Sequence, residues 1–360
     1  MPTWGEITRE LQGLELEQRA SSKLQDPTSP SPHDIIRRKY LNQLSAHTSR
    51  SVIVYASGWL ESRPVSDPSV VGVSTRDKFG FMEAVHDLDK GSLDLILHSP
   101  GGDPDAATAI MRYLREVGFD FIRAIIPISA MSAATMMALG CDEILMGHHS
   151  QLGPIDPQFT LQTPDGPRNA PAQAILDQFD RAKRECAESS QALSAWLPIL
   201  RSYSPGLLSQ CEQAQTAAEE SVSLTMQKYM FKTLPADEAK QKAEKIAEWF
   251  NSHKTHRSHG KPLLYGEVLE QGVNVKLLEN DNELQDKVLS AWHGIQLSLS
   301  QTSVSKLIEN SKGKAWMLSS APGIPLVLRQ EDAKPSRLPS PTSPQPLNRQ
   351  QRRSQGRKSR

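Results

Sequence analysis

The chain has 360 residues, and its 41 basic and 41 acidic side chains give a formal net charge of zero at pH 7. Hydrophobic residues make up 38% and charged residues 23%, enough apolar material for one large core or two modest ones. This composition excludes a disordered, collagen-like or coiled-coil protein over most of the length. The three widely spaced cysteines exclude a disulfide framework, and the first residues lack the layout of a signal peptide. We therefore expect a cytoplasmic protein.

The C-terminal segment differs in composition from the rest of the chain. Residues 321–360 contain nine Lys and Arg, two acidic residues and seven prolines, which leaves a net charge of about −7 for residues 1–320. So polar and proline-rich a segment buries little apolar surface, and we expect residues 318–360 to be a disordered tail. Its positive charge could make weak contact with nucleic acid, an anionic membrane or an acidic partner. A purely solubilising role is the alternative.

Apolar strands and amphipathic helices alternate along the chain. After an N-terminal helix and a Pro/Ser-rich linker (5–24 and 26–33), we expect strands at 51–56, 93–98, 121–127 and directly after residue 141. Helices are expected around 77–89, at 104–117, at 131–140 and over most of 170–251, before a last helix–strand pair and a closing helix. This alternation predicts an α/β domain with a mainly parallel sheet. We place that domain at residues 34–317, after an N-terminal segment at 1–33.

One stretch of the chain raises the question of a membrane span. Residues 124–141 form a run of 18 residues without a charge. Pro127 and three hydroxyl-bearing residues interrupt the run, and β-branched residues crowd its first third. A buried strand followed by a helix of small residues is therefore favoured over a transmembrane helix.

The first candidate for chemistry follows the strand at 93–98. Residues 99–102 (SPGG) end this strand, Asp103 is a good helix N-cap, and Pro104 suits the first helical position. Two glycines allow a sharp turn that leaves amide hydrogens facing outward at the positive end of the helix dipole. Such amides can stabilise a developing negative oxygen. A plain tight turn is the alternative for this motif alone.

The second candidate is the next junction between a strand and a helix. Ser132 stands where a helix is expected to begin, among small residues that allow close approach by a substrate. The amide of Ala133 could supply a second donor to an oxyanion. A serine that only caps a buried helix is the alternative. Two such junctions on successive strands, about 30 residues apart, favour the functional interpretation.

Three motifs in this order, LILHSPGGDPDAATAI, AMSAATMMALGCDEILMG and HSQLGPIDPQF, carry a family resemblance. They resemble the ClpP/crotonase-fold serine peptidases, and most closely the serine dehydrogenase proteinase family, relatives of signal peptide peptidase A. The resemblance implies a ClpP/crotonase-like fold with a helical insertion at about 170–251. It implies Ser132 as the nucleophile and the amides of Gly102 and Ala133 as the oxyanion hole. It also implies a homo-oligomer that acts on a peptide or protein substrate without a cofactor.

A serine hydroxyl is a poor nucleophile unless a neighbouring base takes its proton. ClpP-like enzymes use a histidine about 25 residues after the serine, but here Asp156 and Pro157 stand 24 and 25 residues after Ser132. The relatives of signal peptide peptidase A use a lysine about 50 residues downstream, and Lys183 is 51 residues beyond the serine. By this resemblance Ser132 and Lys183 form a Ser-Lys dyad.

Helical periodicity favours the same lysine. Lys183 shares one helical face with the apolar residues Leu176, Phe179 and Cys186. A lysine on such a face would be desolvated, which favours its uncharged form and lets it act as a base. A lysine that extends its stem along the surface is the alternative.

Four further residues are candidates for lining the site, namely Gly101, His98, Ser150 and Asp156. In the lysine-using relatives a serine often orients the lysine, but Gly153 and Pro154 occupy that place here. Ser150 or Thr135 could substitute for it, and Asp156 could orient a partner or form a turn. His98 could instead face the opposite side of its strand.

Other patterns receive less weight. Three histidines (His253, His256 and His259) are spaced like metal ligands but lack accompanying carboxylates, so we predict no metal site. Two S-x-x-K patterns after residue 302 lack their β-lactamase companions, and no nucleotide-binding motif occurs.

The sequence therefore predicts a serine peptidase. One alternative is a crotonase-like acyl-CoA enzyme that uses the same oxyanion hole, for which only Asp103 and Asp105 could serve as paired acids. The other is a catalytically inactive scaffold of the same fold.

Overall fold

The computed structural model describes residues 3–20, 30–61, 70–163 and 166–319. The chain divides into two units, Met1–Pro322 and Gly323–Arg360. The second unit, which holds most of the expected disordered tail, lies outside the described residues, as does the linker predicted at 26–33 up to residue 29.

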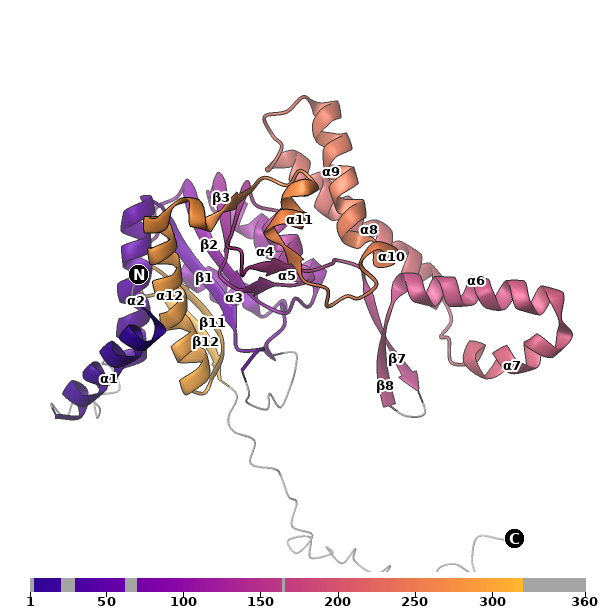
Figure 1. Ribbon diagram of the computed structural model, residues 1–360, viewed down its shortest axis with the longest axis horizontal. Coiled ribbons are helices and arrows are strands. Elements are labelled where there is room, and N and C mark those ends of the chain that lie inside the picture. Colours follow the sequence, from indigo (N-terminus) through magenta and orange to yellow (C-terminus); the bar gives the residue numbers. More distant parts are fainter. Residues whose placement is uncertain (1–2, 21–29, 62–69, 164–165, 320–360) are drawn as a thin grey trace, which may run out of the picture. The chain divides into compact units, whose positions relative to one another are not determined.

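The first unit is built on a sheet with the strand order β10-β5-β3-β2-β1-β11-β12 (Figure 1). Neighbouring strands are parallel from β10 to β1, whereas β11 runs antiparallel to β1 and β12 antiparallel to β11. The prediction of an α/β protein with a mainly parallel sheet is confirmed. The antiparallel pair at one edge was not predicted. The strands are β1 (Ser51–Ser57), β2 (Ser92–His98), β3 (Phe121–Ile126), β5 (Glu143–Met146), β10 (Val275–Leu277), β11 (Val304–Asn310) and β12 (Ala315–Ser319).

Continuous apolar runs form the central strands because both faces of the sheet are covered. All seven residues of β1 are buried. Its side chains alternate between two cores, with Ile53 and Tyr55 in one and Val52 and Val54 in the other.

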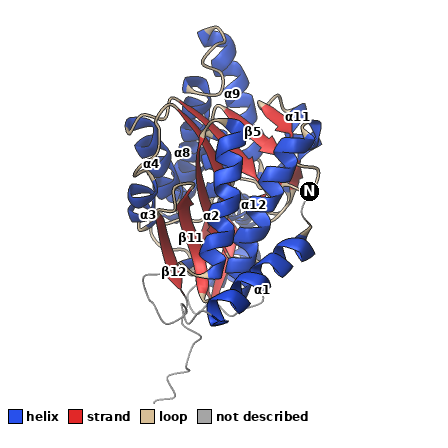
Figure 2. Cartoon of the chain, turned by 90° about the vertical axis from the view of Figure 1, so that its left-hand side faces the viewer, coloured by secondary structure: helices blue, strands red, loops and turns tan. Residues whose placement is uncertain are grey.

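Three helices cover one face of the sheet, and Figure 2 shows two of them, α2 and α12, side by side in front of the strands. They are α1 (Trp4–Ala20), α2 (Pro32–Thr48) and α12 (Asn282–Gln301). A capping box of Ser31 and Asp34 begins α2. Ile7 and Leu11 of α1 are buried in the same core as α2 and α12, so the N-terminal helix is part of this unit.

Several helices contribute to the core on the other face, five of them longer than α11 (Tyr265–Glu270), and the candidate site is on this side. These five are α3 (Asp77–Ala84), α4 (Pro104–Glu116), α5 (Ala133–Leu139), α8 (Leu207–Lys228) and α9 (Ala236–Asn251). The stretch at 124–141 without a charge forms β3, β4 and α5. Among the described residues, no helix has the length and apolar character that crossing a bilayer requires.

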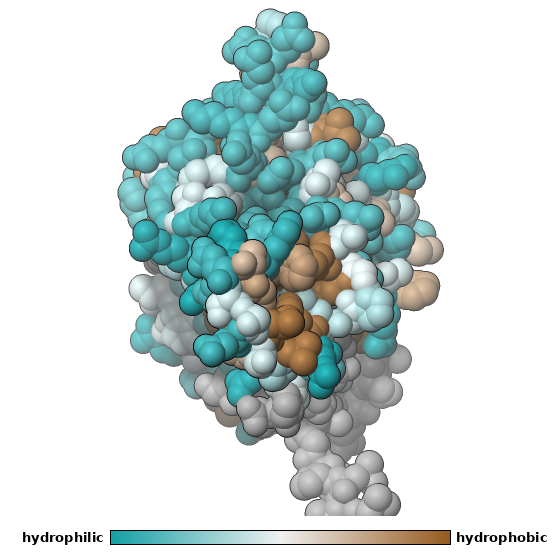
Figure 3. All heavy atoms as spheres, turned by 90° about the vertical axis from the view of Figure 1, so that its right-hand side faces the viewer, coloured by the Kyte–Doolittle hydropathy of each residue, from teal (hydrophilic) through white to brown (hydrophobic). Residues whose placement is uncertain are grey.

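In the chain, a hairpin and two helices come between β6 (Gln151–Leu152) and α8. The hairpin, β7 (Gln158–Thr163) with β8 (Gly166–Pro171), was not predicted, whereas the helices α6 (Ala172–Glu188) and α7 (Ser190–Leu200) lie in the stretch expected to be helical. A small cluster that includes Ile175 and Cys211 packs α6 against α8. No residue of α7 is buried, and its Leu193, Leu197 and Ile199 are exposed. Figure 3 views the molecule from the side on which Figure 1 labels α6 and α7, and apolar side chains gather on this face.

A second, small sheet connects distant parts of the chain. Its strand order is β4-β6-β9, from β4 (Ser129–Ala130), β6 (Gln151–Leu152) and β9 (Leu263–Leu264). Around β9 lie the short helices α10 (His253–His256) and α11 (Tyr265–Glu270), and a 3-10 turn, η3 (Leu278–Asn280), follows β10. This sheet brings the segment that precedes β9 to the same part of the molecule as the start of α5.

Candidate active site

The loop between β2 and α4 has the conformation that its glycines predict. Gly101 and Gly102 have φ of +93° and +147°, a region that residues with a Cβ rarely adopt. Asp103 caps α4 by accepting hydrogen bonds from the amides of Asp105 and Ala106, and proline is at the start of the helix. The loop therefore ends in a well-defined helix start.

Both glycines are also required by close packing. A Cβ on Gly101 would lie 2.6 Å from the Cβ of Ser132, and one on Gly102 would lie 2.5 Å from the backbone nitrogen and oxygen of Val73. The Val73 amide donates to the Gly101 carbonyl at 2.7 Å, and the Asp103 amide donates to the Val73 carbonyl at 2.9 Å. The two predicted junctions thus lie directly against each other, and backbone hydrogen bonds hold the first one in place.

Ser132 has an unusual backbone conformation between β4 and α5. Its φ of 52° and ψ of −119° lie outside the ordinary regions for a residue with a side chain, and its hydroxyl caps no helix. The alternative interpretation as a capping serine is therefore wrong. A sharp, strained turn from strand to helix presents a serine hydroxyl for reaction in other hydrolases.

The two amides assigned to the oxyanion hole are available to a ligand. The bridge to Val73 uses the Gly101 carbonyl and the Asp103 amide but not the amide of Gly102. Ala133 is the first residue of α5, and within the described part of the chain neither its amide nor that of Gly102 donates a hydrogen bond. Ala133 is buried whereas Gly102 is exposed, and two amides without partners beside one hydroxyl are suited to bind an anionic oxygen.

Ser132, Gly102 and Ala133 line one cavity of about 550 Å³. Apolar side chains such as Met136, Ile155 and Phe159 form part of its wall. Small residues of α8 form another part, namely Ala214, Ala217, Ala218 and Ser221. A cavity that is mostly apolar with a few polar groups is typical of a substrate site.

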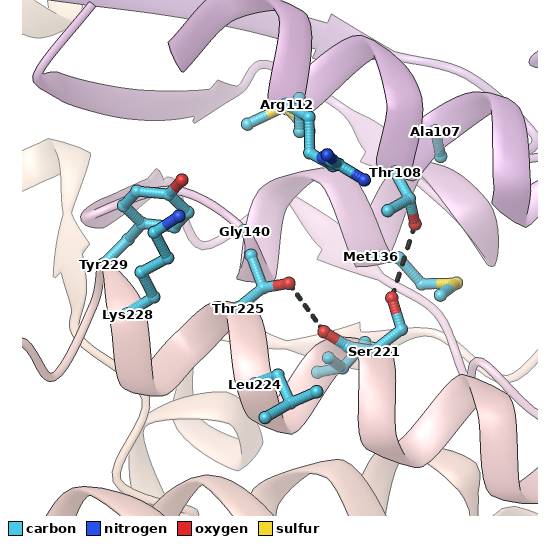
Figure 4. Close-up of a pocket in the computed structure, with 12 residues that line it drawn as sticks. Ala107, Thr108, Arg112, Met136, Gly140, Ser221, Leu224, Thr225, Lys228 and Tyr229 are labelled. Atoms are coloured by element: carbon cyan, nitrogen blue, oxygen red, sulfur yellow. Dashed lines mark hydrogen bonds between the residues drawn. The ribbon is translucent and has the colours of Figure 1, made fainter. Parts of the chain in front are cut away.

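A smaller cavity of about 250 Å³ adjoins the first, between α4 and α8 (Figure 4). Thr108, Met136 and Ser221 line both cavities. The hydroxyl oxygens of Thr108 and Ser221 lie 3.4 Å apart and connect the two helices at this point. The remaining wall of the smaller cavity includes Arg112 and Lys228, which makes it more polar at that end.

Asp156, one of the predicted site-lining residues, lines the larger cavity and is only 2% exposed. Its Oδ1 lies 2.7 Å from Nδ1 of His259, and its Oδ2 lies 3.2 Å from Nδ1 of His253. His259 also lines the cavity. Sequence reasoning noticed these histidines only as a metal-like spacing and did not connect them with Ser132.

No metal arrangement is found around these histidines. Among the described residues, no group of three or more His, Cys, Asp and Glu side chains is placed to hold a metal ion. His256, the middle histidine of the pattern, is buried and bonds through Nε2 to the carbonyl of Trp249 at 2.7 Å. Burial lowers the pKa of His256.

The expectation that Lys183 is desolvated is wrong for the described chain. Its side chain is exposed, and it is not among the residues that line the cavity of Ser132. The buried residues of α6 are Ala172, Ile175 and Ala182, so the face that packs against α8 is not the face that carries Lys183. Of the predicted stripe, Leu176 packs against this cluster but is only partly buried, as are Phe179 and Cys186.

The other predicted site-lining residues fall into two groups. Gly101 packs against the Cβ of Ser132, as described above, whereas Ser150 is a structural residue that donates to the Ile126 carbonyl and accepts from the Gly147 amide. Thr135 likewise donates to a backbone carbonyl, that of Ala130, and is fully buried. Neither hydroxyl is left to orient a lysine.

His98 faces away from the cavity of Ser132. Its ring is 3% exposed and lies between Trp59 and Trp292, at centroid distances of 6.0 and 4.6 Å. Because Trp292 belongs to α12, this ring is on the opposite face of the sheet from α5. Burial lowers the pKa of His98 to about 4.

The comparison with known families agrees with this geometry. Residues 82–193, which include Ser132 and both predicted junctions, match the family of ClpP-like SDH-type serine proteinases. This segment is similar to that family. The resemblance predicted from the three motifs is thus confirmed over the residues that carry them.

Two curated proteins and one solved structure are similar to this chain. The uncharacterized proteins MJ0137 and MJ1495 of Methanocaldococcus jannaschii are 33% identical over 126 residues and 27% identical over 183 residues. The alignments cover 35% and 51% of this chain, and 44% and 51% of the relatives, so the chain spans about half the length of the curated relatives that it matches. A solved structure of the 1510-N membrane-bound stomatin-specific protease, in mutant form, is 16% identical with a TM-score of 0.35, over 60% of this chain and 79% of that one.

Proposed function

We propose that this protein is a serine peptidase that hydrolyses peptide bonds through an acyl-enzyme on Ser132. The observation that carries the proposal is the placement of the Ser132 hydroxyl, on a strained turn, beside two unpaired amides in one cavity. The match of this segment to a serine proteinase family supports the same chemistry.

The arrangement is suited to both steps of such a reaction, the formation of the acyl-enzyme and its hydrolysis. Attack of the Ser132 oxygen on a peptide carbonyl converts the carbonyl oxygen into an anion, and the amides of Gly102 and Ala133 would donate to that anion. One such donor contributes about 3 kcal/mol to transition-state stabilisation. The C–N bond then breaks, the amine leaves, and water hydrolyses the ester on Ser132.

The sequence also predicts which residue acts as the base, namely Lys183. A Ser-Lys dyad requires an uncharged amine next to the hydroxyl, and the exposed position of Lys183 does not favour it within one chain. A dyad formed with Lys183 of a second copy would make peptidase activity depend on assembly.

The proposal is tested by replacing the nucleophile. We expect Ser132→Ala to lower the hydrolysis of fluorescein-labelled casein by about 10³-fold or more, with an unchanged circular dichroism spectrum. Ser209→Ala is the matched control, because Ser209 is exposed on α8 and does not line the cavity. Casein hydrolysis by Ser132→Ala at the wild-type rate would overturn the assignment.

The crotonase-like alternative has a separate outcome. Purified protein that retains coenzyme A, and that converts an acyl-CoA without needing Ser132, would replace the peptidase proposal. We expect neither result.

A further inference from the structure

The carboxylate of Asp156 is held in a defined position in the wall of the cavity that the candidate nucleophile also lines. It is almost fully buried, and three side chains that can donate hydrogen bonds contact it, those of Gln158, His253 and His259. Gln158 donates to Oδ2 at 2.9 Å, in addition to the two histidine contacts. A buried carboxylate is tolerated only when it is paired in this way. Asp156 can therefore orient a group that reaches into the cavity.

Of the two histidines on Asp156, only His259 lines the cavity with Ser132. Its contact with the carboxylate is also the shorter one, at 2.7 Å against 3.2 Å for His253. A carboxylate only accepts hydrogen bonds, so a neutral His259 carries its hydrogen on Nδ1 and has a free lone pair on Nε2. That is the tautomer a general base requires.

The small sheet explains why a residue so distant in sequence is found here. Ser132 comes two residues after β4, and His259 comes four residues before β9. Both strands pair with β6, one parallel and one antiparallel. Asp156 comes four residues after β6 itself. The three residues are thus each connected by a short segment to the same three-stranded sheet.

We propose that His259, oriented by Asp156, is the general base that activates Ser132. This inference rests on the proposed function of Ser132 as a nucleophile. The chain order would then be Ser132, Asp156, His259, which differs from the serine, histidine, aspartate order expected of ClpP-like enzymes and replaces the role predicted for Lys183. Unrelated hydrolases show that the order of these groups in the chain is free as long as their geometry is kept.

The proton inventory of the reaction is complete with these residues. Nε2 of His259 takes the proton of the Ser132 hydroxyl as Oγ forms its bond to the peptide carbon. The protonated ring, stabilised by Asp156, then gives this proton to the amine nitrogen as the C–N bond breaks. In the second half His259 takes a proton from water, which attacks the ester carbon, and returns it to Oγ.

Replacement of the base gives the direct test, in the full-length chain with fluorescein-labelled casein as the probe. We expect His259→Ala to lower kcat by about 10²- to 10⁴-fold, the usual contribution of a general base. Added imidazole should restore part of this activity, because the missing ring leaves space in an open cavity. A merely structural role of His259 would not respond to imidazole. His259→Gln, with a similar shape, guards against loss of the fold.

Two further variants separate orientation from catalysis. Asp156→Asn should lower kcat about tenfold or more without rescue by imidazole, because an amide can favour the wrong tautomer of His259. His253→Ala is the matched control, since His253 contacts the same carboxylate but does not line the cavity. It should lower kcat only a few-fold.

The outcomes are distinct. Suppose that hydrolysis requires Ser132, but that kcat falls less than about threefold in both His259→Ala and His259→Gln. This result would overturn the role of His259 and leave that of Ser132 intact. Loss of activity in Lys183→Ala, together with full activity in His259→Ala, would assign the base to the lysine. Casein hydrolysis that does not depend on Ser132 would overturn both proposals.

Discussion

At the scale of single residues, the backbone of Ser132 is the feature on which the site depends. A residue with a side chain at a φ of 52° costs about 1–3 kcal/mol relative to an ordinary conformation. The surrounding contacts maintain this conformation, because Gly101 packs against the Cβ of Ser132 and the first turn of α5 follows directly. The strain is stored where the hydroxyl must be presented.

Glycine at position 132 should therefore stabilise the fold and abolish the activity. Because glycine adopts positive φ without a steric cost, we expect Ser132→Gly to exceed Ser132→Ala by about 1 kcal/mol in the free energy of unfolding. Urea denaturation of the two inactive variants measures the difference. A glycine variant that is no more stable than the alanine variant would show that the turn is not strained.

His98 gives a pH dependence that is separate from catalysis. Its pKa is about 4 in the folded chain and about 6.5 when unfolded, so the unfolded state binds a proton first as the pH falls. Stability is therefore lost as the pH falls from 6.5 to 4, by about 3 kcal/mol from this residue.

His98→Phe isolates this contribution, because it keeps an aromatic ring between the two tryptophans and cannot be protonated. We expect its free energy of unfolding to fall less than that of the wild type between pH 6.5 and pH 4, by about 3 kcal/mol. Equal losses in the two proteins would contradict a buried neutral His98. Other buried histidines, such as His256, are common to both proteins and cancel in the comparison.

At the scale of elements, α8 forms a wall of small side chains along the cavity. Ala214, Ala217, Ala218 and Ser221 recur with helical spacing and all line it. Ala217 is exposed at this wall, so a larger side chain there can enter the cavity without disturbing the core.

Ala217→Phe should obstruct the substrate. We expect kcat/KM for casein to fall roughly tenfold, while the free energy of unfolding changes by less than about 0.5 kcal/mol. Thr216→Phe is the control, because Thr216 is exposed on the next position of α8 and does not line the cavity. Equal kcat/KM in the two variants would show that the cavity does not bind the substrate.

The same scale shows what sequence patterns can and cannot predict. The central strands were predictable because β1 and β2 are mostly apolar on both alternating sets of positions, with Asp94 the one charge, which requires burial on both faces. The start of α4 was predictable from local capping chemistry at Asp103. The hairpin β7–β8 was missed because most of its residues are only partly buried or exposed and give a weak apolar signal.

Long-range pairings were beyond a single sequence. Helical periodicity predicted α6 but placed Lys183 on the packed face, whereas the buried residues of this helix are Ala172, Ile175 and Ala182 and Lys183 is exposed. His259 lies 127 residues after Ser132, and only the pairing of β4, β6 and β9 brings it to the same cavity. Local patterns were sufficient to propose the nucleophile and its amides, whereas the proposed base required the tertiary structure.

At the scale of the whole molecule, one unit contains the sheet, both helical layers and the candidate site. The helices of the two layers belong to separate cores, and the site is confined to the layer that holds α4, α5 and α8. None of the described residues proposed for catalysis lies on the α2 and α12 face, where His98 has a structural role.

The resemblance to ClpP-like enzymes also predicts a homo-oligomer, which we retain as a proposal. Sedimentation velocity should show a species with at least twice the mass of the 39.9 kDa chain. A single species at the mass of one chain, with full peptidase activity, would contradict it. That result would also exclude a base contributed by Lys183 of a second copy.

Covalent labelling of the nucleophile tests the central claim most directly. A fluorophosphonate bonds to an activated serine oxygen, and tryptic digestion leaves Ser132 in one peptide that spans residues 124–168 together with Ser129 and Ser150. We predict that the added mass in this peptide maps by fragmentation to Ser132 and increases in step with the loss of casein hydrolysis. Complete inhibition with Ser132 unmodified and the label on another residue would contradict the account.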